Sequence, residues 1–599
     1  MSEHPIEFRR HSAAHVMAAA IKHLFPEAKF GVGPVIENGF YYDIDIGRPV
    51  TPEDLKTIEK EMRKIVNQNP AFTREELPID DAIKLFRELD QPYKLELLND
   101  LKTKGTTKVS TEEAQDIDPQ NVGSVTLYRT GDFVDLCRGP HVTEAKEIGA
   151  WKLGKIAGAY WRGKETNPQM QRIYGLCFET EKELDEYQAM LVEAEKRDHR
   201  KLGQELDLFF IDDKIGKGLA MWLPKGVAVR DQVEKLAVEM EAKYGYERVI
   251  TPHIAKEELY LTSGHLPYYK DSMYPPMVMD DGTYYMKSMN CPHHHMMYLH
   301  KPHSYRELPI RLAEYGTVYR NELSGTLAGL LRVRAMAMND AHIYCRKDQI
   351  KEEFKKVMEM TLRYFEIFQL KNYWFRLSKW SPAHPEKYIQ EPEHWEYTQG
   401  VLRDVLQEMD VEFREADDEA AFYGPKIDVQ FKSAIGREES MSTIQLDFLA
   451  KQRFGLAYTD ESGQKNEEVF VIHRAPLSTH ERFMAFLIEH YAGAFPLWLA
   501  PVQIAVLPVA DRHIEFARVL ADELRALGLR VSVDDSSESV GKKIRAAEKQ
   551  KFPRMLVVGD READGGALTV RVHGEKDQQE TSKEKFFEET LASIKSRQA

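Results

Sequence analysis

Two arginine-bearing segments, far apart in the chain, constrain its fold and chemistry more than any other feature. Residues 319–334 are typical of a strand, a loop and a second strand that together carry three arginines. Residues 471–483 are typical of a strand that leads into a helix bearing Arg482. Arginines from adjacent elements suit a triphosphate, because each guanidinium can fork onto anionic oxygens in a fixed geometry. A single arginine is more often part of a weak surface salt bridge, so the argument depends on the ordered set.

Length and composition limit the class of protein. A chain of 599 residues with 42% hydrophobic and 30% charged residues is expected to form several globular domains. No segment approaches the roughly 18 consecutive apolar residues of a membrane span, and the N-terminus has no signal-peptide pattern. Four cysteines are too few for a disulfide scaffold, so we expect reduced thiols in a cytoplasm. A net charge of −15 excludes a uniformly basic surface but allows a local basic face.

The N-terminal third mixes helical and strand patterns and is predicted to be an α+β domain over residues 1–180. A long charged helix over about 180–202 looks like a connector to the next domain. Within the domain we expect helices over 11–24, 51–67 and 79–89 and a hairpin over 30–45 with its turn at Asn38-Gly39.

The rest of the chain shows two different patterns. From residue 203, an amphipathic helix over 227–246 and a short strand ending at Pro252 precede strand-rich sequence that a helix over 347–368 interrupts. From residue 499 the pattern becomes a β/α alternation, which favours a mostly parallel sheet. Its expected strands are 502–509, 529–534, 554–559 and 568–572, and its expected helices are 513–527, 539–549 and 583–593.

Four further segments make a family resemblance specific: 289–292 (MNCP), 339–345, 421–426 and 444–448. With the two arginine segments, they resemble the motifs of class II aminoacyl-tRNA synthetases, in particular threonyl-tRNA synthetases, in the right order. The resemblance covers about residues 7–590. It implies ATP-dependent attachment of L-threonine to its tRNA through threonyl-adenylate, with hydrolytic editing of seryl-tRNA. It also implies a homodimer built on the helix and strand that end at Pro252.

The resemblance implies a multidomain α+β architecture. The expected parts are an α+β editing domain (1–180), a connecting helix (181–202), a class II catalytic domain with an antiparallel sheet (203–498) and an α/β anticodon-binding domain (499–599). Many bacterial relatives carry a small additional domain before the editing domain. Here the editing-type sequence starts at once, so we expect that domain to be absent.

A catalytic zinc is implied by the resemblance rather than by spacing. Spacing alone would favour local pairs, such as Cys291 with His294 or His295, or His342 with Cys345. A metal has a purpose here, because an apolar pocket discriminates poorly between threonine and valine, whereas a site that binds the hydroxyl does so well. The zinc ligands that the resemblance implies are Cys291, His342 and His473.

The same resemblance assigns the other residues of the site that would activate threonine with ATP, called here the synthetic site. It also implies that Mg²⁺ accompanies ATP. The catalytic residues would be Arg320, Arg482 and Lys426; the threonine-binding residues Met289, Arg320, Asp340, Tyr423 and Gln445; and the ATP-binding residues Arg320, Glu322, Arg332, Val333, Met336 and Arg482. The chain also departs from the family pattern. Met336 replaces a phenylalanine that stacks on adenine, Met338 replaces a polar residue, and Ser440 replaces a glutamine. Leu323 and His293 are milder departures, for a proline and a glycine.

A second histidine cluster lies near the N-terminus. His11 and His15 share one face of a helix, and Cys137 and His141 add a thiol and a third imidazole. This set suits zinc and suits acid/base chemistry equally well. With Tyr42, Lys94 and Asp135 it resembles the editing pocket shared by threonyl- and alanyl-tRNA synthetases, which implies a metal-free hydrolytic site. Such a site is needed because serine keeps the hydroxyl, and losing one methyl changes binding by only about 1–3 kcal/mol.

Basic residues in the last domain predict contacts with RNA. A lysine-rich helix alone is usually a solvated face, and the resemblance favours the tRNA anticodon. The candidate residues are Glu538, Lys542, Lys543, Arg545 and Arg571. Three rival hypotheses stay open at this point: a paralogue that has lost amino-acid activation, a deacylase that works through the N-terminal domain, and a structural zinc protein.

Overall fold

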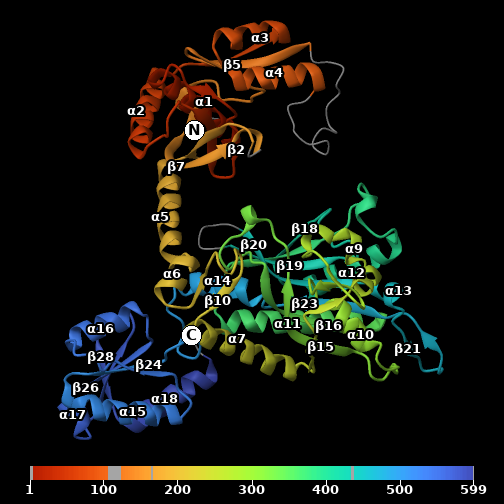
Figure 1. Cartoon of the computed structure of the whole chain (residues 1–599), viewed down its shortest axis with the longest axis vertical. Coiled ribbons are helices and arrows are strands. Elements are labelled where there is room, and N and C mark those ends of the chain that lie inside the picture. The colour runs from red at the N-terminus through yellow and green to blue at the C-terminus, as the bar shows by residue number, and fades with distance from the viewer. Residues whose placement is uncertain (1–3, 106–122, 164–165, 433–437, 598–599) are drawn as a thin grey trace. The chain divides into compact units, whose positions relative to one another are not determined.

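The computed structural model describes residues 4–105, 123–163, 166–432 and 438–597 (Figure 1). Its contacts divide the chain into two compact units, Met1–Leu191 and Val192–Ala599. The boundary falls inside helix α5 (Glu181–Arg197), within the predicted connector. Among the described residues, no helix combines the length and apolar character that crossing a bilayer requires.

The first unit contains two antiparallel sheets. One has the strand order β1-β3-β8-β7 with β2 paired to β3, and the other has the order β4-β5-β6. Their strands are β1 (Lys29–Phe30), β2 (Val35–Ile36), β3 (Gly39–Asp45), β4 (Phe72–Pro78), β5 (Ser124–Thr130), β6 (Phe133–Leu136), β7 (Ala150–Tyr160) and β8 (Gln169–Phe178), and the helices are α1 (Ile6–Leu24), α2 (Pro52–Gln68), α3 (Ile79–Glu88) and α4 (Pro92–Lys104).

Helix α1 forms the centre of the first unit. Its residues 12–21 are all buried, and its alanines and aliphatic side chains pack with those of β3, β8 and α2 in one core. A helix that is apolar on nearly every side belongs in an interior. The predicted hairpin is present, but Ile36 pairs with Gly39, so the turn residues are Glu37 and Asn38, one position earlier than expected. Gly39 instead starts β3, where a Cβ atom would lie 2.0 Å from the carbonyl oxygen of Gly175.

The predicted connector consists of two helices rather than one. Helix α5 ends at Arg197, and α6 (His199–Glu205) begins after Asp198. The Asp198 carboxylate accepts a hydrogen bond from the backbone N–H of Arg200 at 2.8 Å, which caps α6. Aspartate is a favoured N-cap residue because it satisfies an amide that the helix leaves free. A capping residue inside a charged helical pattern explains why periodicity alone missed the break.

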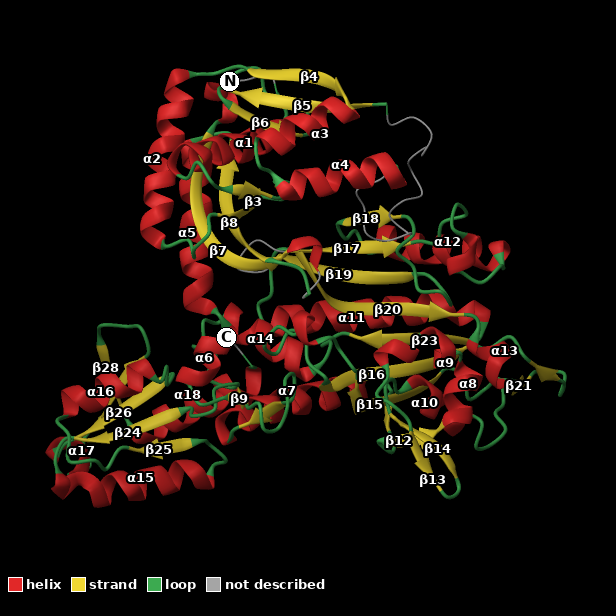
Figure 2. Cartoon of the chain, turned by 45° about the horizontal axis from the view of Figure 1, so that its top comes forward, coloured by secondary structure: helices red, strands yellow, loops and turns green. Residues whose placement is uncertain are grey.

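The second unit is built on an eight-stranded sheet with the order β11-β15-β16-β23-β20-β19-β17-β18 (Figure 2). Its pairs are antiparallel except β11 with β15 and β17 with β18. The expected antiparallel catalytic sheet is therefore confirmed. The strands are β11 (Glu247–Arg248), β15 (Ile310–Tyr319), β16 (Ala335–Cys345), β17 (Tyr373–Ser378), β18 (Phe413–Ala416), β19 (Lys426–Lys432), β20 (Glu438–Asp447) and β23 (Phe470–Ala475).

The two faces of this sheet have different roles. Ile343, Ile444 and Ile472 lie on the face that packs into the largest core, together with side chains of four helices. Because successive strand residues point to opposite faces, the neighbours His342, Gln445 and His473 lie on the other face. The four helices are α7 (Pro224–Lys243), α11 (Ile350–Ile367), α12 (Pro392–Glu408) and α14 (His480–His490).

Shorter elements complete the second unit around the sheet. The strand predicted over 246–252 is reduced to the two residues of β11, which pair in parallel with β15. Helix α10 matters for the site, since it begins at Cys291. The short elements are α8 (Glu257–Ser263), α9 (His265–Tyr268), α10 (Cys291–Tyr298), α13 (Ala450–Phe454), β9 (Phe209–Ile211), β10 (Ala220–Trp222), β12 (Ile254–Lys256), β13 (Met277–Met279), β14 (Gly282–Met286), β21 (Tyr458–Thr459) and β22 (Lys465–Asn466).

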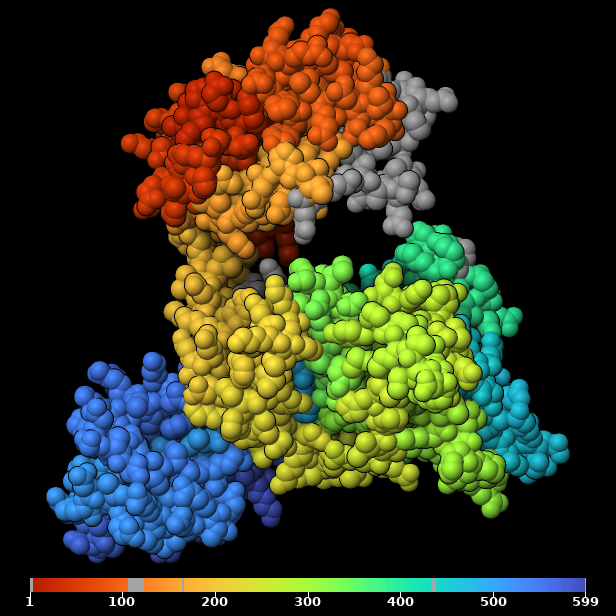
Figure 3. Space-filling view, in the orientation of Figure 1, coloured from red at the N-terminus to blue at the C-terminus, as the bar shows by residue number. Residues whose placement is uncertain are grey.

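The C-terminal residues form a five-stranded sheet with the order β25-β24-β26-β27-β28, and in the space-filling view they make a rounded lobe (Figure 3). β25, β24 and β26 are parallel as predicted, whereas β27 and β28 are antiparallel. The elements are β24 (Ile504–Pro508), α15 (Ile514–Ala526), β25 (Val531–Val533), α16 (Val540–Lys549), β26 (Arg554–Val558), α17 (Asp560–Ala563), β27 (Leu568–Val572), β28 (Gln578–Thr581) and α18 (Lys583–Ser596). The pattern had not revealed α17 or β28.

Candidate active site

One cavity on the open face of the eight-stranded sheet gathers every residue predicted for the synthetic site. Its volume is about 700 Å³. It brings together side chains from β16, β19, β20 and β23, from the start of α10 and from α14. The predicted residues that line it are Met289, Cys291, Arg320, Glu322, Arg332, Val333, Met336, Asp340, His342, Tyr423, Lys426, Gln445, His473 and Arg482.

Cys291, His342 and His473 meet at one point of this cavity. Their candidate ligand atoms all lie within 4.8 Å of one another. Each histidine has one ring nitrogen engaged elsewhere: His473 Nε2 lies 3.2 Å from an Asp447 carboxylate oxygen, and His342 Nδ1 lies 2.8 Å from His294 Nδ1. One nitrogen of each ring is left for a metal, with its partner nitrogen held as in most metal sites. One thiol and two imidazoles therefore fit a catalytic zinc with three protein ligands.

Burial sets the protonation of these groups. It lowers the pKa of His342 well below the ordinary value, so the imidazole is neutral and carries a lone pair. Burial raises the pKa of the Cys291 thiol and, next, the nearby carboxylates of Asp340 and Asp447 raise it further. A divalent cation reverses such a shift, because it stabilises the thiolate directly.

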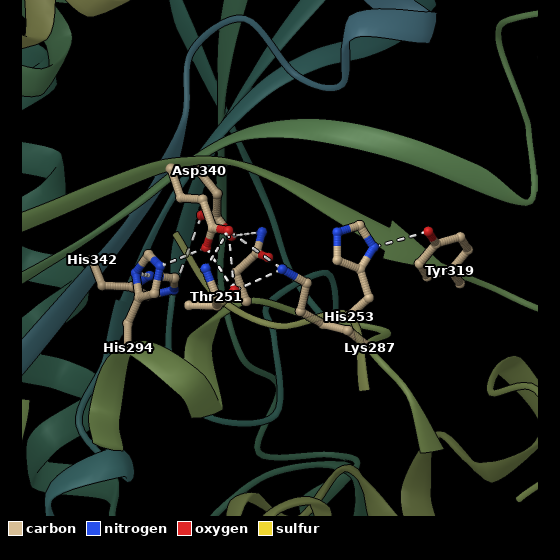
Figure 4. Close-up of polar contacts among 9 residues, drawn as sticks. Thr251, His253, Lys287, His294, Tyr319, Asp340 and His342 are labelled. Atoms are coloured by element: carbon tan, nitrogen blue, oxygen red, sulfur yellow. Dashed lines mark hydrogen bonds and ion pairs between the residues drawn. The ribbon is translucent and has the colours of Figure 1, made fainter. Parts of the chain in front are cut away.

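Asp340 lies two residues before His342 on the same face of β16. Its Oδ2 accepts a hydrogen bond from Asn290 Nδ2 at 3.1 Å (Figure 4). Asn290 reaches this position because Gly316 on β15 has no side chain: a Cβ there would lie 2.2 Å from Asn290 Oδ1. Burial raises the pKa of Asp340, and the Asn290 hydrogen bond opposes that shift. The carboxylate is thus fixed beside the candidate metal ligands, where it can accept a hydrogen bond from a hydroxyl.

A pair of side chains closes the cavity beside His473. The Tyr423 hydroxyl donates to Gln445 Oε1, and Gln445 Nε2 donates to Thr443 Oγ1 at 3.3 Å. Gln445 is the register partner of both His473 and Lys426 on the neighbouring strands. Lys426 Nζ lies 2.8 Å from Asp428, so its charge is already paired.

The three predicted arginines, Arg320, Arg332 and Arg482, bring positive charge to the cavity. Arg332 pairs with Glu322 at 2.8 Å, and Arg482 donates from Nε to the Leu331 carbonyl at 3.2 Å. Burial lowers the pKa of Arg320. It also lowers the pKa of Arg482, and the charges of Arg320 and Arg332 lower it further. Mutually repelling guanidiniums with few carboxylate partners suit a polyanion.

Three of the family departures, Met336, Met338 and Ser440, line this cavity. Met336 is 7% exposed and packs with Val318 and Val333 in a small apolar cluster, with Met338 against it. The Ser440 hydroxyl accepts a hydrogen bond from Gln430 Nε2 at 2.6 Å, and its carbonyl lies 3.4 Å from Arg482 Nη1. Leu323 is largely exposed, whereas His293 is buried in α10.

The structure also brings the four residues of the N-terminal histidine cluster together. The candidate ligand atoms of His11, His15, Cys137 and His141 lie within 4.8 Å of one another. The Cys137 sulfur lies 3.3 Å from both His11 Nε2 and His141 Nε2. The other ring nitrogen of His11 faces the Pro140 carbonyl at 3.2 Å. The cluster, apart from His141, borders a cavity of about 400 Å³.

A set of buried polar side chains contacts that cluster through His15. Asp135 contacts Lys94 Nζ at 2.5 Å and His15 Nε2 at 3.4 Å, and the Tyr42 hydroxyl donates to it. Burial lowers the pKa values of His11, His15 and His141. Burial, followed by the charge of Asp135, raises the pKa of Cys137 to about 12. Neutral imidazoles and a neutral thiol can orient a water and move its protons.

Comparison with known proteins identifies the family of the chain. Three family descriptions match the chain: "tRNA synthetase class II core domain (G, H, P, S and T)" over 277–491, "Anticodon binding domain" over 503–593, and "Threonyl and Alanyl tRNA synthetase second additional domain" over 125–174. Threonine–tRNA ligase of Geobacillus sp. (strain WCH70) is 49% identical over 591 residues, which are 98% of this chain and 89% of the relative. The chain belongs to the threonine–tRNA ligase family.

Further similarities support this family assignment. Threonine–tRNA ligase 1 of Bacillus subtilis (strain 168) is 49% identical over 595 residues, or 99% of this chain and 90% of the relative. A crystal structure titled as the RNA-binding domain of threonyl-tRNA synthetase from Cryptosporidium parvum Iowa II aligns with a TM-score of 0.63 and 34% identity. That alignment covers 67% of this chain and 98% of the other. The expected fold class is thus confirmed for this member of the family.

Several residues of the synthetic site were not predicted from the sequence of this family member. Asn290, His294, Glu314 and Asp447 all contact a predicted site residue or one another. Spacing favours His294 as a ligand, but its two nitrogens face His342 Nδ1 and Glu314, so it lies behind the candidate ligand His342. Asn290 directly precedes Cys291, which is a weak local signal. Glu314 and Asp447 have none, because sheet pairing alone brings them to the site.

The predicted anticodon residues do not all lie on a free surface. Lys542 and Arg545 are exposed on α16, although Lys542 pairs with Glu538 at 2.8 Å. Lys543 is buried and donates from Nζ to the Pro508 carbonyl at 3.1 Å. The expectation that Lys543 contacts RNA therefore does not fit this structure, because a helix of period 3.6 turns it inward between exposed neighbours. Arg571 is partly buried on β27.

Proposed function

We propose that this chain attaches L-threonine to its tRNA at the expense of ATP and hydrolyses seryl-tRNA at a separate site. One observation carries the synthetic assignment. The metal-ligating cluster and Asp340 share a single cavity with the three arginines. A site that recognises an amino acid with a hydroxyl therefore lies beside a site for a triphosphate, as adenylate formation requires.

The arginines would act on ATP. Arg320, Arg332 and Arg482 would bind the phosphates, with Glu322, Val333 and Met336 lining the nucleotide pocket and Mg²⁺ accompanying the nucleotide. The threonine carboxylate attacks the α-phosphorus, and pyrophosphate leaves. Charge that spreads over the phosphate oxygens in this step is stabilised by guanidiniums already fixed in a partly dry cavity. The terminal hydroxyl of the tRNA then attacks the carbonyl carbon of the adenylate and releases AMP.

Threonine would be selected by the groups around His342. Cys291, His342 and His473 would hold a zinc ion, which would supply a Lewis acid for recognition of the amine and hydroxyl of threonine. Asp340 accepts the hydroxyl proton, and Tyr423 and Gln445 orient the amino acid, with Met289 against it. Asn290 donates to only one oxygen of the Asp340 carboxylate, so valine leaves the other oxygen without a hydroxyl donor, and a buried acceptor left unpaired is expensive. Lys426 is a less direct participant, since Asp428 neutralises it.

Seryl-tRNA would be hydrolysed in the first unit. His11, His15, Cys137 and His141 would surround a water and the ester bond, and Lys94, Tyr42 and Asp135 would hold His15 in place. We propose that this chemistry proceeds without a metal. The neutral state that burial imposes on the imidazoles supports acid/base work, because each ring can accept a proton from water or pass one to the leaving hydroxyl.

The assembly implied by this function is a cytoplasmic homodimer that binds tRNA. We propose editing, connecting, catalytic and anticodon-binding parts over 1–180, 181–202, 203–498 and 499–599. Two strongly exposed apolar side chains in this part of the chain support a second copy: Ile250, two residues after β11, is 80% exposed, and Val278 on β13 is 82% exposed. Lys542 and Arg545 on α16, with Arg571 and Glu538, are the proposed anticodon contacts.

The test is ATP–pyrophosphate exchange by the zinc-replete protein with each standard amino acid. We expect strong exchange with threonine, weaker exchange with serine and none with valine. Arg320→Ala is the matched loss-of-function control, because it removes a phosphate ligand and leaves the metal site. If no amino acid supports exchange while mischarged seryl-tRNA is still hydrolysed, the ligase assignment fails and the chain acts as a deacylase. Met336, Met338 and Ser440, at the departures from the family pattern, motivate the rival hypothesis of a paralogue that has lost amino-acid activation, which the same exchange assay tests.

A further inference from the structure

A chain of buried polar side chains extends from the metal-ligating residue His342 into the interior (Figure 4). His342 Nδ1 lies 2.8 Å from His294 Nδ1, and His294 Nε2 lies 3.1 Å from Glu314 Oε2. Glu314 in turn contacts Thr251 and Lys287. We refer to His294, Glu314, Lys287 and Thr251 as the relay. The synthetic mechanism described above uses none of these four groups.

The donors around Glu314 fix the direction of every hydrogen bond in the relay. Its Oε1 accepts from the backbone N–H of Thr251 at 3.0 Å and lies 3.4 Å from Lys287 Nζ. The Thr251 hydroxyl lies within 3.0 Å of both carboxylate oxygens. Burial alone would raise the pKa of Glu314, but hydrogen bonds from His294 and Thr251 and the charge of Lys287 lower it to about 2. Glu314 is therefore a carboxylate, which can only accept.

The proton positions on both imidazoles follow from this. Because Glu314 only accepts, His294 Nε2 must carry the proton of that hydrogen bond. A neutral His294 then has a lone pair on Nδ1, since only one ring nitrogen is protonated. The contact between His294 and His342 at Nδ1 therefore requires His342 Nδ1 to donate. A neutral His342 with its proton on Nδ1 has its lone pair on Nε2.

We propose that His294 and Glu314 are positioning residues that hold His342 in the one tautomer whose Nε2 can ligate the metal. The inference rests on the proposed zinc site and extends it to groups that never touch the ion. Second contacts of this kind commonly fix the ring orientation and basicity of a ligating histidine. The other candidate histidine ligand, His473, has a simpler arrangement, in which its Nε2 contacts the Asp447 carboxylate directly.

The fold builds the relay and the ligand cluster from the same elements. Helix α10 carries Cys291 at its first position and His294 one turn later, so ligand and relay share one helix face. Glu314 on β15 is the register partner of Asp340 on β16, two residues before His342. A displacement of α10 relative to the sheet would therefore disturb the cysteine ligand and the relay together.

The cost of the relay argues that it has a function. Lys287 and His294 are 0% exposed, and Glu314 and Thr251 are buried as well. A buried ion pair seldom stabilises a protein more than apolar side chains of the same shape do. A purely structural core at this place would be served as well by apolar residues. His294 is also excluded as an alternative ligand, because both of its nitrogens are engaged within the described structure.

The decisive variant is Glu314→Gln, which is isosteric but reverses one hydrogen bond. Thr251 and Lys287 donate to the Oε1 side, so the amide oxygen takes that side and the NH₂ group faces His294 Nε2. Because that NH₂ group donates, His294 must accept at Nε2 and carry its proton on Nδ1. His294 then donates to His342 Nδ1, and the single proton of His342 shifts to Nε2, the nitrogen that would ligate the metal. We expect zinc affinity, measured by competition with a chromophoric chelator, to fall about 10- to 100-fold. The d–d absorption of bound Co²⁺ should lose intensity in parallel.

Two substitutions of His294 test the inference even if Glu314→Gln does not fold. Asparagine places an amide oxygen near the position of His294 Nδ1, so it can still accept the hydrogen bond from His342. The longer glutamine places its amide towards Glu314, so it cannot accept that hydrogen bond. We expect His294→Asn to bind zinc more tightly than His294→Gln. The matched control is His303→Gln, which removes another buried histidine with two hydrogen-bond partners, Tyr298 and Glu307. Circular dichroism and thermal melting of the zinc-free proteins report on folding.

The outcomes separate the inference from the function on which it rests. Cys291→Ala defines the zinc that depends on the proposed site. If the wild-type protein holds no Cys291-dependent zinc, the proposed metal site itself is wrong. If it holds such zinc, and Glu314→Gln and both His294 variants bind it like the wild type, the positioning role is overturned. Weaker binding by Glu314→Gln and His294→Gln, with unchanged binding by His303→Gln, supports it.

Discussion

His342 and His473 are direct register partners on the neighbouring antiparallel strands β16 and β23. Residues opposite each other on such strands have their Cβ atoms about 4.5–5.5 Å apart, on the same face. Their rings therefore meet although the chain separates them widely, and Cys291 approaches from the first turn of α10. A slip of either strand by one residue would turn one imidazole into the core. The strand register is thus the main structural requirement of the proposed metal site.

Removal of the metal should affect one activity and spare the other. Dialysis against a strong zinc chelator is expected to abolish threonine-dependent pyrophosphate exchange, because Asp340 alone cannot bind the amine. Hydrolysis of seryl-tRNA should persist, since the histidines of the proposed editing site belong to the other compact unit and are proposed to act without an ion. Both activities are measured on the same sample before and after addition of zinc. Loss of both activities would contradict a metal-free editing site.

Substitution of Gly316 by alanine should impair threonine binding at a distance. The new Cβ would lie 2.2 Å from Asn290 Oδ1, so Asn290 must move and release Asp340. The hydrogen bond to a charged group that is lost is worth about 1.5–3 kcal/mol, or about 10- to 100-fold in kcat/KM for threonine. We expect the KM for ATP to change little. Steady-state pyrophosphate exchange at varied threonine and ATP provides both values.

The control for this substitution is Gly400→Ala. Gly400 lies in α12, and a Cβ there would meet no atom within 4 Å. Alanine in a helix is favoured over glycine by about 0.5–1 kcal/mol, so this variant should melt slightly higher and retain full activity. Equal losses in the two variants would mean that the Gly316 effect is not transmitted through Asn290.

In the first unit, His11→Gln should uncouple proofreading from synthesis. The His11 ring is held by the Pro140 carbonyl and presents Nε2 to Cys137 at 3.3 Å. Loss of one acid/base group lowers a rate by about 10²- to 10⁴-fold. Hydrolysis of preformed seryl-tRNA should fall accordingly, while threonine activation is unchanged. His23→Gln, on the same helix but outside the cluster, should hydrolyse like the wild type.

The sequence predicts repeating patterns well and pairings poorly. The alternation after residue 499 predicts its parallel strands correctly, but not that β27 and β28 turn antiparallel, because strand direction is not a local property. In the site, spacing favours Cys291 and His294 as metal ligands. The structure instead places His294 in contact with the candidate ligand His342. The resemblance to a family supplies the distant ligands that spacing cannot. Glu314, which completes the arrangement, enters only through its strand partner.

His480 should make the fold sensitive to mild acid. Burial lowers its pKa to about 4, with Glu234 opposing and Arg230 reinforcing the shift. In the unfolded chain the pKa of a histidine is about 6.5. Because the pKa of His480 is lower in the folded protein than in the unfolded chain, its contribution to the free energy of unfolding is fully retained above about pH 6.5. It is lost as the pH falls towards 4, since protons then favour the unfolded chain. The loss reaches about 2 kcal/mol by pH 5.

His480→Phe tests this assignment without emptying the site. The ring stacks on Tyr315 at 4.2 Å, and phenylalanine can keep that contact. Urea unfolding of both proteins at pH 7.5 and pH 5 should show the variant gaining about 2 kcal/mol relative to the wild type on acidification. Parallel pH dependences in the two proteins would show that His480 does not titrate as described.

Met336→Phe should strengthen binding of ATP. Met336 lines the cavity in which we propose that ATP binds, and it packs with Val318 and Val333. An aromatic ring would offer adenine a flat partner, and stacking of aromatic pairs adds about 0.5–1.5 kcal/mol beyond burial. The KM for ATP in pyrophosphate exchange should therefore fall about 2- to 10-fold, with the KM for threonine unchanged. Met336→Leu, which offers similar volume without a π face, should leave the KM for ATP near that of the wild type. If phenylalanine instead raises the KM for ATP and lowers the melting temperature, overpacking against Val318 and Val333 outweighs stacking.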